Sequence, residues 1–164
     1  MLASWCQERL RLPLLQGLAT SAVAGAEGLV RSSRAALIRF LNLHGPSSNP
    51  NIIVSLLQVL STGLNENLQD DRYAIPIVEL IAFVIDNYHS YALVDASESN
   101  SLDPIFRKVF VLVQKAHFRS SNIARMEAAV KVYTAMSRLE PLRGDVLKKL
   151  TGMLLHPFPR VRPN

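Results

Sequence analysis

The chain has 164 residues, of which 49% are hydrophobic and 19% are charged, with 9 prolines and 7 glycines. This composition excludes a disordered chain, and the length suffices for one domain that buries about 70% of its unfolded surface. The net charge of +5 favours an acidic partner, but the lysines and arginines are dispersed among several predicted helices. We therefore predict solvent-exposed helix faces and no nucleic-acid binding.

A first helix is predicted over residues 12–24, where Pro13 lies in the first turn and its missing N–H needs no partner. Arg9 and Arg11 precede this apolar stretch, as the basic residues of a signal peptide would. Polar residues interrupt the apolar part, however, and Glu8 lies in the basic part. We therefore predict no secretory signal.

The next helix is predicted over residues 28–42 and has a broad apolar stripe at helical spacing. The stripe consists of Leu29, Val30, Ser33, Ala36, Leu37, Phe40 and Leu41. The other face carries Arg31, Arg34 and Arg39. Glu27 precedes Arg31 by four residues, which allows a small favourable ion pair.

Turn residues at 44–51 separate this helix from another whose apolar face begins at residue 52 and ends at Gly63. Asp71 and Arg72 then precede a long apolar helix over residues 73–93, with Pro76 in its first turn or at a small kink. The polar residues that follow, 95–103, predict an exposed loop.

Pro104 is predicted to open a helix that ends at His117, and Ser120, Ser121 and Asn122 to cap the next one. Residues 140–144 combine proline and glycine and predict a turn, after which Asp145 is expected to cap the last helix.

About seven helices therefore alternate with short breaks, and no segment alternates as a half-buried strand does. The two-helix period near 40 residues is typical of HEAT and armadillo repeats. We predict an all-α, HEAT/armadillo-like, right-handed solenoid segment forming one helical-repeat domain over residues 1–164. The turn at 157–162 resembles the entry to residues 28–42, which favours a segment cut from a longer solenoid at both ends.

Sequence motifs for nucleotide binding, metalloprotease chemistry and redox catalysis are missing. Cys6 is the single cysteine, and the four histidines are predicted near different helix ends. We predict no enzyme activity, no cofactor and no metal site. The apolar runs are too short to span a membrane.

The arginines allow two interpretations. They either bridge neighbouring repeats, with Asp70 and Asp71 as partners, or they contact an acidic partner surface. The candidate residues for both roles are Glu27, Arg31, Arg34, Asp71, Arg72, Arg160 and Arg162. An enzyme acting on an anion is a third alternative, and it requires a pocket that joins Arg31, Arg34 and a histidine.

Residues 14–41 resemble the C-terminal region of the tubulin-specific chaperone D (tubulin-folding cofactor D) family, and the resemblance continues in order along nearly the whole chain. The matching positions are Glu27, Val30, Arg31, Ser33, Asp71, Arg72, Pro76, Gly144, Asp145, Val146, Phe158, Pro159 and Arg162.

The resemblance implies a HEAT and armadillo-like scaffold of the tubulin folding and assembly pathway, in the cytoplasm and on the microtubule cytoskeleton. Its implied partners are β-tubulin, the tubulin-folding cofactors E and C, and an Arf-like small GTPase. Within such a complex it would stimulate GTP hydrolysis by tubulin. The alternative from the same helical pattern is a HEAT/armadillo-type adaptor unrelated to tubulin.

Overall fold

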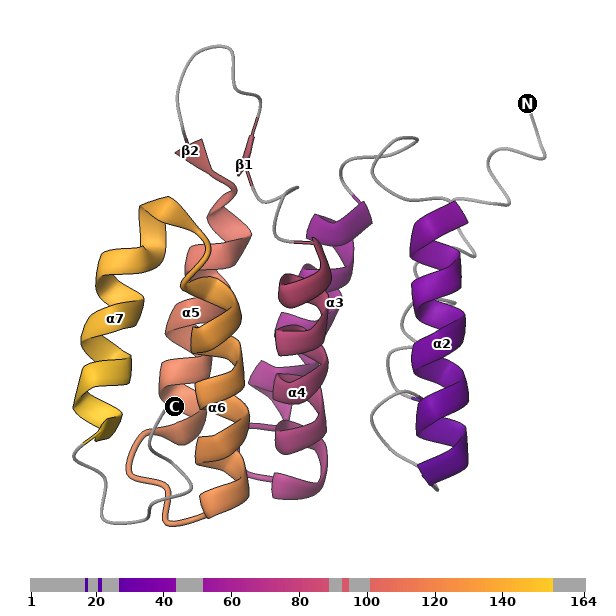
Figure 1. Cartoon of the computed structure of the whole chain (residues 1–164). Helices are drawn as coiled ribbons and strands as arrows, with labels where there is room; N and C mark the ends of the chain where they lie inside the picture. Colours follow the sequence, from indigo (N-terminus) through magenta and orange to yellow (C-terminus); the bar gives the residue numbers. More distant parts are fainter. Residues whose placement is uncertain are drawn as a thin grey trace.

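The computed structural model describes Gly17, Ser21 and residues 27–43, 52–88, 93–94 and 101–154. Within these ranges the chain forms helices joined by short links, with one two-residue strand pair, so the all-α prediction is confirmed (Figure 1). The helices are α2 (Glu27–Leu43), α3 (Ile52–Glu66), α4 (Asp71–Tyr88), α5 (Pro104–His117), α6 (Ile123–Met136) and α7 (Glu140–Leu154). Of the predicted helix at 12–24, only Gly17 and Ser21 are described, and both are helical.

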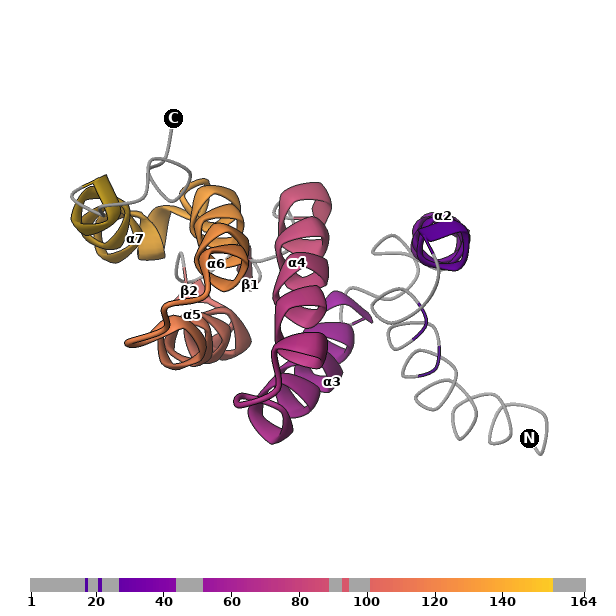
Figure 2. The ribbon, with the colours of Figure 1, turned by 90° about the horizontal axis from the view of Figure 1, so that it is seen from below.

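The helices are arranged as stacked antiparallel hairpins. Helices α3 and α4 form one hairpin and α5 and α6 the next, with α3 packed on α5 and α4 packed on α6 (Figure 2). Helix α7 packs against α6, and α2 lies at the opposite end of the row from α7 (Figure 1). Hairpins that bury their apolar faces mainly against neighbouring hairpins define an α-solenoid, so the HEAT/armadillo-like architecture is confirmed.

The two central hairpins are offset by 52 residues, since α3 begins at Ile52 and α5 at Pro104, and α4 begins at Asp71 and α6 at Ile123. The predicted period near 40 residues is therefore too short for this pair of hairpins. The connection between α4 and α5 accounts for the difference. It contains residues 89–103, and the offset between hairpins includes this connection as well as the two helices of one hairpin.

Helix α4 lies at the centre of the core, and its sequence explains why. Its buried residues occupy more than one helix face, as expected for a helix that packs against α3 and α6. These residues are Ala74, Ile77, Val78, Leu80, Ile81, Ala82, Val84, Ile85 and Tyr88. By contrast, α5 is amphipathic, and it exposes Arg107, Lys108, Val111 and Lys115 on the side away from the core.

Side-chain caps fix the helix starts. The Asp103 carboxylate accepts a hydrogen bond from the Ile105 N–H at 2.9 Å, with Pro104 at the first helical position. The Asn122 side chain accepts one from the Arg125 N–H at 3.3 Å. Both starts agree with the sequence prediction. Asp70 caps α4 in the same way, through the Arg72 N–H at 3.0 Å.

The apolar stripe predicted on residues 28–42 is narrower in the structure. Ser33, Leu37 and Leu41 are buried at four-residue spacing, whereas Ala36 is exposed. The side chains of Leu29 and Phe40 lie outside the described part of the chain. Among the α2 residues whose side chains are described, the buried ones therefore form a single line along the helix.

The predicted end of α4 is wrong, and of the two predicted places for Pro76 the first turn is ruled out. The helix ends at Tyr88 instead of residue 93, and Leu93–Val94 (β1) pairs antiparallel with Ser101–Leu102 (β2), so that β2 lies inside the predicted loop at 95–103 and β1 just before it. The Asn87 side chain, next to the end of the helix, donates to the Phe83 carbonyl one turn earlier at 2.8 Å. Because α4 begins at Asp71, Pro76 is its sixth residue and lies beyond the first turn.

The last helix also starts earlier than predicted. Residues 140–144 are helical, so Asp145 lies inside α7 and does not cap it. The Leu139 carbonyl accepts hydrogen bonds from the Leu142 and Arg143 N–H groups, both at 2.9 Å, and so begins the helix. Pro141 fits the first turn, where its missing N–H has no helical partner, and Gly144 costs about 1 kcal/mol within a helix.

Candidate functional site

The α3–α4 and α5–α6 connections lie at the same end of the stack (Figure 1). Near these connections a buried arginine joins the two central hairpins. Arg125 is the third residue of α6, and its side chain is only 10% exposed. Its Nε and Nη2 atoms both lie 2.6 Å from Oδ1 of Asp71, the first residue of α4. A guanidinium buried to this degree needs such a partner, because an isolated buried charge is unstable.

The remaining donors of this guanidinium also find partners. Arg125 Nη1 donates to the carbonyl oxygens of Leu68, at 2.7 Å, and Ala116, at 2.8 Å. Leu68 lies in the α3–α4 connection, and Ala116 lies near the end of α5. Arg125 therefore links both hairpins through one planar group with several donors in fixed directions.

The cap of α6 belongs to the same network. The Asn122 side chain donates to Asp71 Oδ2 at 2.8 Å while its oxygen accepts from the Arg125 backbone. Asp71, a predicted site residue, thus receives hydrogen bonds from two residues of the next hairpin. Arg125 itself was missed by sequence reasoning. The available signal was an arginine on the apolar face of an otherwise apolar helix start.

A second set of ion pairs crosses α2, α4 and α6. Glu79 of α4 pairs with Lys131 of α6 at 2.7 Å, and its other oxygen lies 3.8 Å from Nη2 of Arg34 on α2. Further along, Arg138 of α6 pairs with Asp86 of α4 at 2.7 Å. The carboxylate near Arg34 is therefore Glu79, and neither Asp70 nor Asp71 takes that place.

We expect Glu79→Gln to lower the free energy of unfolding by about 0.5–1 kcal/mol. Both of its pairs are partly exposed, which limits the contribution of each pair. Urea unfolding at low salt measures the loss, and about 1 M salt should reduce it because screening weakens the wild-type pairs. A loss unchanged by salt would contradict an electrostatic role. Glu127→Gln on α6 is the matched control, since Glu127 forms no ion pair with the part of the chain that the structure describes.

The other predicted site residues lie on α2, at the start of α4 or outside the described residues. Arg72 is 83% exposed and pairs with neighbouring Asp70 at 2.9 Å. That guanidinium hydrogen bond lowers the pKa of Asp70. Arg31 is exposed on α2, and Glu27 is the first residue of that helix. Arg160 and Arg162 lie outside the described residues.

His117 ends α5 and contacts the core. Its Nε2 lies 2.6 Å from the hydroxyl of Tyr133, which is fully buried on α6, and the two rings meet edge to face at 5.6 Å. Burial lowers the pKa of His117 to about 4, and the positive charge of Lys149 adds to this effect. Burial also raises the pKa of Tyr133. Both side chains are therefore neutral near pH 7 and serve packing.

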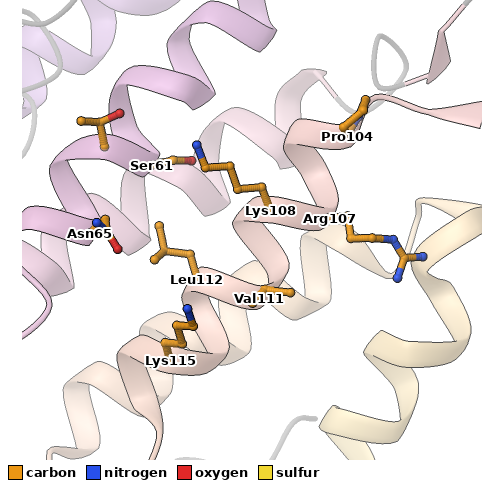
Figure 3. Close-up of a pocket in the computed structure, with 9 residues that line it drawn as sticks. Ser61, Asn65, Pro104, Arg107, Lys108, Val111, Leu112 and Lys115 are labelled. Carbon is orange, nitrogen blue, oxygen red and sulfur yellow. The ribbon is translucent and has the colours of Figure 1, made fainter.

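A groove of about 510 Å³ runs between α3 and α5 on the outer side of the stack (Figure 3). Three cations from α5 line it, namely Arg107, Lys108 and Lys115. The remaining lining residues are Ser61, Thr62, Asn65, Pro104, Val111 and Leu112. Neither Arg31 nor Arg34 lines this groove, and no histidine does, so it is not the pocket that the enzyme alternative requires.

The described residues contain neither a cluster suited to a metal ion nor a helix suited to a membrane. No group of three histidine, cysteine, aspartate or glutamate residues is placed to hold a metal ion. No described helix is long and apolar enough to cross a lipid bilayer.

Comparison with known proteins identifies the family. No solved structure matches the chain. A family model described as the tubulin folding cofactor D C-terminal region matches residues 4–125, which is most of the chain and includes α2 to α5. The Asp71–Arg125 pair lies within that range, and the resemblance predicted from residues 14–41 and 71–76 is confirmed. The chain therefore belongs to the tubulin folding cofactor D family and corresponds to its C-terminal region.

Proposed function

We propose that this chain is a helical scaffold that binds β-tubulin and other tubulin-folding cofactors during the folding and assembly of tubulin. The observation that carries the proposal is the family match over residues 4–125. The stacked hairpins support it, because α-solenoids present long continuous surfaces suited to protein partners.

The same proposal assigns the chemistry to the partner. As part of a complex with cofactors E and C, the chain promotes GTP hydrolysis by tubulin, and the nucleotide is bound and hydrolysed on tubulin. An Arf-like small GTPase is the proposed regulator. The complex acts in the cytoplasm and at the microtubule cytoskeleton. We further propose that the chain behaves as one helical-repeat domain.

The inter-helix ion pairs support a rigid scaffold. Arg125 holds the two central hairpins in one register, and Glu79 links α2, α4 and α6. We propose that Arg34 and Asp71 act as such braces. Glu27, Arg31, Arg72, Arg160 and Arg162 then remain as candidates for partner contact.

A reconstitution experiment tests the proposal. The chain is placed in a longer cofactor D scaffold, and the complex with purified tubulin, cofactor E and cofactor C is followed by size-exclusion chromatography and by the rate of GTP hydrolysis. We expect co-elution with β-tubulin and faster hydrolysis. The matched control replaces residues 12–162 with a HEAT-repeat segment of similar length and charge. Equal binding and equal hydrolysis by this control would refute the assignment.

A further inference from the structure

We propose that the groove between α3 and α5 binds an acidic peptide segment of a partner protein. The inference rests on the scaffold function proposed above and adds the chemistry of one docking site. It is argued from the charge, the unpaired donors and the shape of the groove.

The charge of the groove has one sign. Of the nine residues that line it, three are cations and none is a carboxylate. In this respect the groove differs from the surface formed by α2, α4 and α6, where Glu79 and Asp86 pair with the nearby cations. A concave surface lined with positive charge attracts negative groups more strongly than a flat one, because the low-dielectric walls focus the field.

Two of the three cations are available to a ligand. Arg107 points away from the groove toward α7 (Figure 3), where its Nη1 lies 3.7 Å from Asp145. Lys108 and Lys115 are exposed, and their ammonium groups have no hydrogen bond or ion pair with the part of the chain that the structure describes. Seven residues separate them, so they lie on one face of α5, about 10 Å apart along its axis.

The surface between these two lysines is apolar. Leu112 is almost fully buried and forms part of the floor, while Val111 is 44% exposed. A suitable ligand therefore carries carboxylates about 10 Å apart with an apolar side chain between them. An extended peptide spans that distance in about three residues.

The α3 wall offers hydrogen-bond acceptors to a peptide backbone. Thr62 is exposed, and its hydroxyl donates to the Gln58 carbonyl at 3.0 Å, which leaves its lone pairs to accept N–H groups. Ser61 is buried behind it and donates to the Leu57 carbonyl at 2.7 Å. Asn65 lies one turn further along the same wall and is exposed (Figure 3).

A nucleic acid fits this groove less well. No aromatic ring lines it, so it lacks a surface on which bases could stack. Its only arginine is turned toward Asp145, which removes the planar group that binds phosphate through two hydrogen bonds. Lysines over an apolar floor, with the exposed Thr62 hydroxyl opposite, suit a carboxylate-bearing peptide better.

Fluorescence anisotropy tests the inference on the full 164-residue chain. The probe is a short fluorescein-labelled peptide in which glutamates flank a central valine. We expect the wild-type chain to bind it and the double variant Lys108→Glu/Lys115→Glu to bind about tenfold more weakly or worse, as expected for the loss of two exposed ion pairs. The matched control is Lys148→Glu/Lys149→Glu on α7, which changes the net charge equally at exposed positions outside the groove.

Three outcomes would overturn the inference. The first is equal weakening by both double variants, and the second is tighter binding of a fluorescein-labelled oligonucleotide than of the peptide. The third is a loss of binding when glycine replaces the valine of the peptide, together with no effect of the lysine substitutions. Lys108→Ala/Lys115→Ala, with thermal unfolding as a folding check, keeps the test valid if the glutamate variant fails to fold. Co-elution with tubulin is measured on the same proteins, so that a failed groove with intact tubulin binding is distinguished from a failed scaffold.

Discussion

Replacing Arg125 with methionine is expected to lower the free energy of unfolding by about 2–4 kcal/mol. The change preserves much of the side-chain length but removes every hydrogen bond of the guanidinium. Asp71 loses its charged partner, and the carbonyls of Leu68 and Ala116 lose their donors. The two carbonyl oxygens are left without their donors, and an acceptor left unpaired away from water costs about 1–3 kcal/mol, whereas Asp71 is 46% exposed and water can hydrate its charge.

Urea unfolding followed by circular dichroism measures the effect. Arg72→Met is the matched control, since Arg72 is also an arginine beside an aspartate near the start of α4 but is 83% exposed. We expect the control to leave the unfolding midpoint nearly unchanged. The double variant Arg125→Met/Asp71→Asn should recover part of the loss, because it removes the charge that was left alone. A loss no larger for Arg125→Met than for Arg72→Met would show that Arg125 does not brace the hairpins.

The helices could be predicted because their signals are local. Apolar residues at three- and four-residue spacing identified α3, α5 and α6, and the caps at Asp103 and Asn122 correspond to starts expected from the sequence. The errors also have local causes. Pro141 and Gly144 resemble a turn but are compatible with the start and interior of α7, since tertiary packing overrides weak local preferences.

The ion pairs between hairpins could not be predicted from local spacing. Glu79 and Lys131 are 52 residues apart, Asp71 and Arg125 are 54 apart, and nothing in the single sequence marks either separation. The offset becomes meaningful only once α4 is seen to pack on α6 with the same 52-residue shift. Residues at stacked positions of α4 and α6 then carry opposite charges, so the ion pairs between the hairpins follow from the stacking.

The groove was also beyond sequence reasoning, for a different reason. Lys108 and Lys115 share a face of α5 by their seven-residue spacing, and that much is visible in the sequence. Their opposite wall is supplied by Ser61 and Thr62 of α3, which belong to the preceding hairpin. A dispersed charge of +5 thus contains a local cluster that only the packing of α3 on α5 creates.

The second large effect is expected on acidification. The folded-state pKa of His117 is about 4, below its usual value near 6.5, because burial disfavours the charged ring. The unfolded chain therefore binds a proton more readily than the folded chain between these two pH values. Stability from this residue is complete above about pH 6.5 and is lost as the pH falls toward 4. We expect the free energy of unfolding to drop by about 2–3 kcal/mol across that window on account of His117, since each unit of pKa difference corresponds to about 1.4 kcal/mol and the ring keeps partial contact with water.

His117→Gln isolates the contribution, because glutamine does not titrate and its side chain still has a group able to hydrogen-bond the Tyr133 hydroxyl. Urea unfolding of both proteins at a series of pH values from 7 to 4 gives the difference in stability between them. Protonation of carboxylates affects both proteins alike and cancels in this difference. The wild-type chain should lose its advantage progressively below pH 6.5, and a difference that stays constant over the window would mean that His117 titrates normally in the folded chain. Lys149 adds to the lowering of the pKa of His117. Lys149→Gln should therefore raise this pKa slightly, toward that of a normal histidine, and make the loss of stability on acidification slightly smaller.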